Sequence, residues 1–128
     1  MKEKIFSKKA PEPLGPYSQA IKISDFEDLI FISGQIPINP ETGGLIDDDI
    51  TEATKQTLEN IKSIIEESGA SLDDVVKVQI YLKDLDDFDE MNDIYEDYFT
   101  NSQPARAAVE VSKIGLDAPI EIDAIVAL

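Results

Sequence analysis

The sequence contains no cysteine and no histidine. Without cysteine there is no disulfide framework, and without either residue the usual ligands of zinc, copper and iron are missing. Only oxygen ligands remain, and the acidic run Asp47–Asp49 lacks the alternating spacing and distal glutamate of a calcium loop. We therefore expect a solvated turn there and no metal site in the protein.

Cations are scarce: 11 lysines plus arginines stand against 27 acidic residues, and the net charge is -16. A charge of that sign repels phosphate backbones and anionic membranes, so nucleic acid and membranes are poor partners. No apolar run approaches the roughly 20 residues of a membrane span, and Met1–Lys9 lacks the apolar stretch of a secretion signal. We expect a cytoplasmic protein.

The chain of 128 residues is 42% hydrophobic, which is enough apolar material to build a core. No internal repeat, low-complexity tract or long linker divides it. We expect residues 1–128 to form a single domain.

The first third is rich in turn residues, and between them lie two short β-prone pieces, Ala20–Ile23 and Leu29–Ser33, spaced like a hairpin. From Ile50 the period becomes helical. Asp49 and Glu52 resemble a capping box, and Gly69 ends the run. We expect the most secure helix of the chain here.

The second half alternates strand and helix patterns. We expect a buried strand over Val75–Leu82, a helix from Phe88 to Phe99 opened by Asp87, and strands over Ala105–Val111 and Ile120–Ala127. The order β-β-α-β-α-β-β predicts an α+β (mixed α/β) layer in which two helices cover one face of one mixed sheet. Little chain is left to cover the other face of the sheet, so we expect a second copy of the chain to cover it.

Arg106 is the only arginine, and it lies among small and apolar residues at the start of a predicted strand. A guanidinium in such surroundings needs a partner, and its planar fork suits a carboxylate. From the residues alone, binding of a ligand and a structural ion pair are equally open.

Glu121 alternates with Ile120 and Ile122 in the last strand, so it lies on the opposite face from them. It is a candidate general base for a water, or an ordinary surface acid, or the ion-pair partner of Arg106. Tyr17, in a glycine-opened loop, could bind a ligand or simply tie its hydroxyl to the backbone.

Two further positions have the same two interpretations. Ser33 and Gly34, at a strand end, could offer backbone N–H groups to an anion or form a plain turn. Asn92 interrupts the apolar stripe of the second helix, so it faces a site or water.

Four segments, taken in order and at their spacing, resemble the signature segments of the Rid family, also called YjgF-type proteins: Gly15-Pro16-Tyr17-Ser18-Gln19-Ala20, Ser33-Gly34-Gln35-Ile36-Pro37, Pro104-Ala105-Arg106 and Ile120-Glu121-Ile122-Asp123-Ala124. The resemblance implies a chorismate-mutase-like fold, a homotrimer with clefts between subunits, and RidA-like hydrolysis of 2-iminopropanoate and 2-iminobutanoate to 2-oxo acids and ammonia, with no cofactor. By position, Arg106 would hold the substrate carboxylate and Glu121 would orient the water. Tyr17, Ser33, Gly34 and Asn92 would line the pocket.

The sequence departs from the family pattern in a few places. Ala108 stands where many members carry a cysteine, which puts any thiol-dependent behaviour in doubt; Gln103 replaces a larger residue and Asp123 a commoner glutamate.

Two other functions are weighed against the imine deaminase. One is a non-catalytic trimeric sensor or regulatory protein that binds small ligands in the same cleft. The other comes from family members reported as ribonucleases or translation inhibitors. The net charge and the absence of histidine as acid or base oppose that function.

Overall fold

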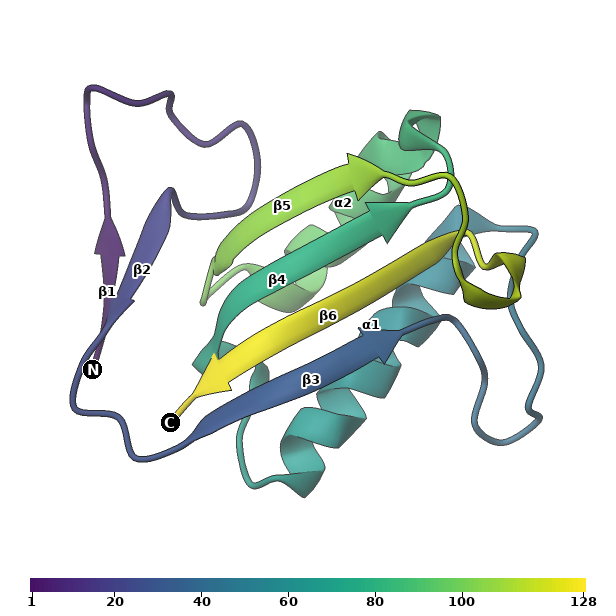
Figure 1. Cartoon of the computed structure of the whole chain (residues 1–128), viewed down its shortest axis with the longest axis horizontal. Helices are drawn as coiled ribbons and strands as arrows, with labels where there is room; N and C mark the ends of the chain where they lie inside the picture. The colour runs from purple at the N-terminus through teal and green to yellow at the C-terminus, as the bar shows by residue number, and fades with distance from the viewer.

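The computed structural model describes residues 1–128 (Figure 1). The strands are β1 (Lys2–Ile5), β2 (Ala20–Ile23), β3 (Leu29–Gln35), β4 (Val75–Leu82), β5 (Ala105–Glu110) and β6 (Ile120–Ala127), and the helices are α1 (Ile50–Glu67) and α2 (Phe88–Phe99). Neither helix has the length and apolar character needed to cross a membrane.

The main sheet has the strand order β3-β6-β4-β5. Strand β6 pairs antiparallel with both β3 and β4, whereas β4 and β5 are parallel and are joined through α2. Both helices lie behind the sheet, and the front face is open (Figure 1). The predicted α+β architecture, with two helices on one face of a mixed sheet, is confirmed.

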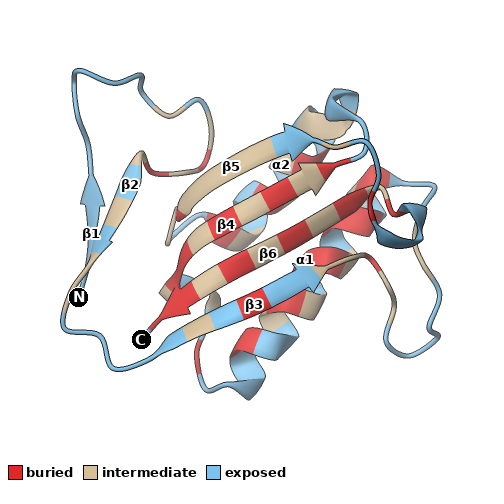
Figure 2. Cartoon of the chain, viewed as in Figure 1, coloured by how far each residue is buried: buried red, intermediate tan, exposed pale blue.

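The core fills the space between the sheet and the helices. Buried and partly exposed residues alternate along β4 and β6 (Figure 2), because successive side chains of a strand point to opposite faces. The helix-facing side chains that are fully buried include Val78, Ile80 and Ile122, which pack with Leu58 and Ile61 of α1 and Met91 of α2.

The ends of α1 follow from its sequence. The carboxylate of Asp49 accepts hydrogen bonds from the backbone N–H groups of Thr51 (3.0 Å) and Glu52 (3.3 Å), so one half of the predicted capping box forms. The helix ends before Gly69, whose φ of 87° is left-handed. Asp49 is thus a helix cap, and no group of three acidic side chains is placed to hold a metal ion.

The predicted hairpin of Ala20–Ile23 with Leu29–Ser33 is wrong. Strand β2 pairs with β1, and β3 pairs with β6. The first strand escaped prediction because Lys2–Ile5 is exposed along its whole length and shows no apolar alternation; instead, Glu3 lies opposite Lys22 across the pair.

The start of α2 also differs from the prediction. Asp87 makes no side-chain capping bond there. A short turn of 3-10 helix, Leu85–Asp87, precedes the helix, and Asp84 caps it by accepting from the N–H of Asp86 at 2.9 Å.

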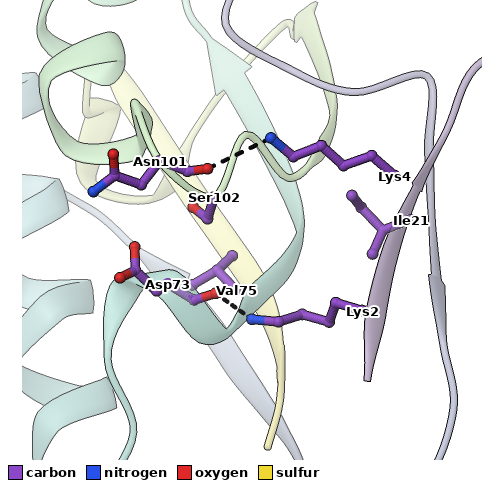
Figure 3. A pocket seen from close by; sticks show the side chains of 7 residues that line it. All are labelled: Lys2, Lys4, Ile21, Asp73, Val75, Asn101 and Ser102. Atoms are coloured by element: carbon purple, nitrogen blue, oxygen red, sulfur yellow. Dashed lines mark hydrogen bonds between the residues drawn. The ribbon is translucent and has the colours of Figure 1, made fainter.

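Two lysines dock the β1–β2 hairpin onto the body (Figure 3). Across a cavity of about 340 Å³, Lys2 donates to the carbonyl of Asp73 and Lys4 lies 3.5 Å from the carbonyl of Asn101. At the other end of β2, the hydroxyl of Ser18 donates to the carbonyl of Gln103 at 2.6 Å. These contacts hold the loop that carries Tyr17 against the start of β5.

Candidate functional site

Arg106 projects from β5 toward the helices. It lies opposite Val78 in the parallel ladder, so it shares the helix-facing side with that buried residue. Its Nη1 donates to Oδ1 of Asn92 on α2 at 2.7 Å. The guanidinium is half-buried, and the amide of Asn92 fixes one edge of it.

Three aromatic rings surround the same guanidinium. Its central carbon lies 4.7 Å from the ring centre of Tyr95, 5.0 Å from that of Tyr17 and 5.6 Å from that of Phe88. We call Tyr17, Phe88, Asn92, Tyr95 and Arg106 the Arg106 cluster. The apolar stripe of α2 predicts Phe88 and Tyr95 to pack in the core, and both do; their contact with Arg106 was not predicted. The available signal was their spacing, because residues 88, 92 and 95 fall on one helix face.

Arg106 has no carboxylate partner within the chain. The three ion pairs of the structure are Lys2–Asp74, Lys55–Glu52 and Lys83–Asp117. Burial lowers the pKa of Arg106 from its usual value, but a guanidinium remains charged in proteins. The cluster therefore presents one uncompensated positive charge, which suits binding of an anion.

The loop before β2 closes over Arg106. A Cβ at Gly15 would lie 3.1 Å from Nη2 of Arg106, which is a tight contact, and 3.7 Å from Nδ2 of Asn92, which is an ordinary one, so a larger residue would require a small shift of Arg106. The hydroxyl of Tyr17 accepts from the backbone N–H of Leu14 at 3.1 Å. Tyr17 thus ties its hydroxyl to the backbone while its ring faces the arginine.

Glu121 projects from β6 to the other face of the sheet, away from Ile120 and Ile122. It packs against Gly34, where a Cβ would lie only 2.8 Å from Cδ of Glu121. The ladder between β3 and β6 shifts register between Ile32 and Gln35, which is a bulge. Ser33 and Gly34 lie in this bulge and are both exposed, and Gly34 is the one shown against the carboxylate.

Tyr81 and Asp123 flank Glu121, and sequence reasoning missed the tyrosine. Tyr81 lies opposite Glu121 in the β4–β6 ladder, and its hydroxyl donates to Oδ2 of Asp123 at 3.2 Å. Burial, followed by the charges of Asp123 and Glu121, raises the pKa of Tyr81. We call Ser33, Gly34, Tyr81, Glu121 and Asp123 the Glu121 cluster; it gathers acceptors and negative charge.

The two clusters lie on opposite faces of one sheet, so a single chain does not bring Arg106 and Glu121 together. The interpretation of Glu121 as the ion-pair partner of Arg106 is therefore wrong. A hollow of about 390 Å³ beside the Arg106 cluster is lined by Gly15, Asn92 and Glu96 among others. A second hollow, of about 380 Å³, lies between the end of β3 and α1 and shares only Gly34 with the Glu121 cluster.

Comparison with known proteins identifies a matching family profile and close relatives in sequence and structure. The profile described as Endoribonuclease L-PSP matches residues 7–128. A RutC family protein from Pyrococcus abyssi is 60% identical over 124 residues, which span 97% of this chain and 95% of the relative. The 2-iminobutanoate/2-iminopropanoate deaminase of Salmonella typhimurium is 40% identical over 98% of this chain and 97% of its own length. The crystal structure of a Rid family protein of unknown function from Yersinia pestis superposes with a TM-score of 0.76, 41% identity and complete coverage of both chains.

Proposed function

Because the chain belongs to the Rid family, the family of the L-PSP profile, we propose that it hydrolyses 2-imino acids such as 2-iminopropanoate and 2-iminobutanoate to 2-oxo acids and ammonia. The family includes imine deaminases. The observation that carries the proposal is the state of Arg106, a half-buried guanidinium that pairs with no carboxylate of a chain containing 27 acidic residues.

The reaction needs orientation and a base. In this proposal, the fork of Arg106 holds the substrate carboxylate with two parallel hydrogen bonds. The imine carbon is already electrophilic, and Glu121 accepts a proton from the water that adds to it. Glu121 returns that proton to nitrogen, which gives a carbinolamine. It then takes the hydroxyl proton and passes it to nitrogen as the C–N bond breaks, so that the C=O bond of the 2-oxo acid forms and ammonia leaves. Tyr17 and Asn92 line the carboxylate end, Ser33 and Gly34 line the water end, and no cofactor enters.

Because the two clusters lie on opposite faces of the sheet, a site that uses both of them needs two copies of the chain. One copy supplies the Arg106 cluster, and the open sheet face of its neighbour supplies the Glu121 cluster. That face also exposes apolar side chains, with Phe31 70%, Val109 42% and Leu29 40% exposed, which is the character of a surface that associates. We propose a cytoplasmic homotrimer of single RidA-like domains (residues 1–128), with the sites in its subunit clefts.

RNA cleavage, which the name of the matched profile suggests, is not proposed. The net charge of -16 opposes an RNA backbone, and the chain has no histidine to act as acid or base.

The test is release of 2-oxo acid from 2-iminobutanoate generated in place, compared among native protein, Arg106→Lys and Arg106→Ala. We expect kcat/KM to fall about 100-fold or more in Arg106→Ala, since it leaves the substrate carboxylate unpaired. Arg106→Lys keeps the charge but loses the fork, so we expect an intermediate value. Circular dichroism and thermal melting establish that each variant folds.

A native protein that leaves the spontaneous rate unchanged would overturn the deaminase. If it then binds 2-oxobutanoate and loses that binding in Arg106→Ala, the sensor function takes its place.

A further inference from the structure

Besides Asn92, two aromatic residues of α2, Phe88 and Tyr95, lie against the guanidinium of Arg106. We infer that Phe88 and Tyr95 are positioning residues for Arg106: with Tyr17 they hold its guanidinium between aromatic faces in place of a carboxylate, and so keep its charge free for the substrate. This inference rests on the proposed function, because it assigns the carboxylate of the imino acid to Arg106.

The geometry shows how one helix face supplies this support. Phe88, Asn92 and Tyr95 are spaced four and then three residues apart, and all three contact the guanidinium. Residues at this spacing lie above one another on a helix. The ring of Tyr17 adds a third face from a different element. Together these residues leave the guanidinium a single side-chain hydrogen-bond acceptor, Oδ1 of Asn92.

Aromatic faces and a carboxylate hold a guanidinium in different ways. A carboxylate would occupy the N–H fork and cancel the charge, whereas a ring attracts the cation through its face and leaves the in-plane N–H groups available. The chain has 27 acidic residues with which to pair its one arginine, yet none forms an ion pair with it.

Tyr95 shows that the ring, and not the hydroxyl, makes this contact. The residue is 0% exposed, and its hydroxyl has no hydrogen-bond partner. Burial raises its pKa far above the usual value, so the phenol stays neutral and cannot pair with Arg106 as a phenolate. An unpartnered buried hydroxyl is unfavourable, and phenylalanine would support the guanidinium equally well.

The experiment measures KM and kcat for 2-iminobutanoate, and the Kd of 2-oxobutanoate by calorimetry, in native protein and four variants. In Phe88→Leu and Tyr95→Leu we expect KM and Kd to rise about fivefold to tenfold, because a cation–π contact is lost. We expect kcat to stay within about twofold, since the base lies on the other cluster. Tyr95→Phe, which keeps the ring, restores KM and Kd to near the native values.

Tyr98→Leu is the matched control. Like Tyr95→Leu, it removes a tyrosine side chain, but from a position one turn further along α2. The hydroxyl of Tyr98 donates to Glu59, and Tyr98 does not contact Arg106. We expect a lower melting temperature with unchanged KM and Kd. If Phe88→Leu and Tyr95→Leu lower only the melting temperature, or if Tyr95→Phe weakens binding as much as Tyr95→Leu, the positioning role is wrong.

The two measurements separate this inference from the proposed function. If native protein binds 2-oxobutanoate without turning over the imine, the deaminase fails, and the Kd series alone decides the positioning role. If native protein is active and the leucine variants keep native KM and Kd, the deaminase stands and the positioning role fails.

Discussion

The Arg106 cluster and the Glu121 cluster differ in how the chain holds their charged side chains. Arg106 is half-buried and is fixed by three rings and one amide from two other parts of the chain. Glu121 lies on the open face, against a glycine and beside a tyrosine that donates its hydrogen bond to Asp123. In the proposed site, the group that binds substrate is therefore preorganised within one chain. The base depends on a neighbouring copy to complete its surroundings.

Among substitutions that compare the two clusters, Glu121→Gln is expected to have the largest effect on activity. The amide keeps the shape of the side chain but cannot accept a proton, so we expect kcat to fall about 100-fold or more. KM should stay within about threefold, because the carboxylate of the substrate is held by the other cluster. Steady-state kinetics measure both. Glu67→Gln, an exposed acid at the end of α1, is the charge-matched control, and a native kcat in Glu121→Gln would remove it as the base.

Mixing two inactive variants tests whether the two clusters of one site come from different copies of the chain. Arg106→Ala and Glu121→Gln are each expected to be inactive. When the two are unfolded together and refolded at equal amounts, about a quarter of the sites in random trimers combine a native Arg106 with a native Glu121. We expect activity to recover from about 1% to about 25% of the native value. If light scattering shows mixed trimers and activity does not recover, the shared site is wrong.

The sequence predicted those parts of the fold that follow from local pattern. Alternation in Ile120–Ala127 placed Glu121 on the face away from the core, and the helical period placed α1 between Asp49 and Gly69. It could not predict the partner of β2, because the exposed strand β1 pairs through backbone hydrogen bonds and cross-strand charges, without a buried face.

Contacts within the two clusters were beyond prediction for a related reason. Phe88 and Tyr95 belong to the apolar stripe of α2 and pack with the core, but their additional contact with Arg106 depends on the packing of β5 against α2. The approach of Gly34 to Glu121 depends likewise on the bulge in β3 and on the register of β6. Local pattern fixes the face on which a side chain lies, and tertiary packing determines its neighbours.

Gly34→Ala tests whether the close approach of Gly34 to Glu121 positions the carboxylate for catalysis. The backbone of Gly34 does not have a positive φ, so alanine adds only a methyl group, which would lie 2.8 Å from Cδ of Glu121. The carboxylate must move, and because misplacing a catalytic group is costly, we expect kcat to fall about tenfold with little change in KM. A native kcat would mean that the position of Glu121 does not limit the reaction.

Gly15→Ala makes the same change in the other cluster and should give the smallest effect. Its methyl group would lie 3.1 Å from Nη2 of Arg106, and a guanidinium held between rings can yield by a small rotation of its side chain. We expect KM to rise about threefold and kcat to stay constant, measured in the same assay as Gly34→Ala. Since both variants add one methyl group to a glycine without a positive φ, backbone strain cannot account for a difference between them. If Gly15→Ala lowers kcat and Gly34→Ala raises KM, the division of binding and catalysis between the two clusters is reversed.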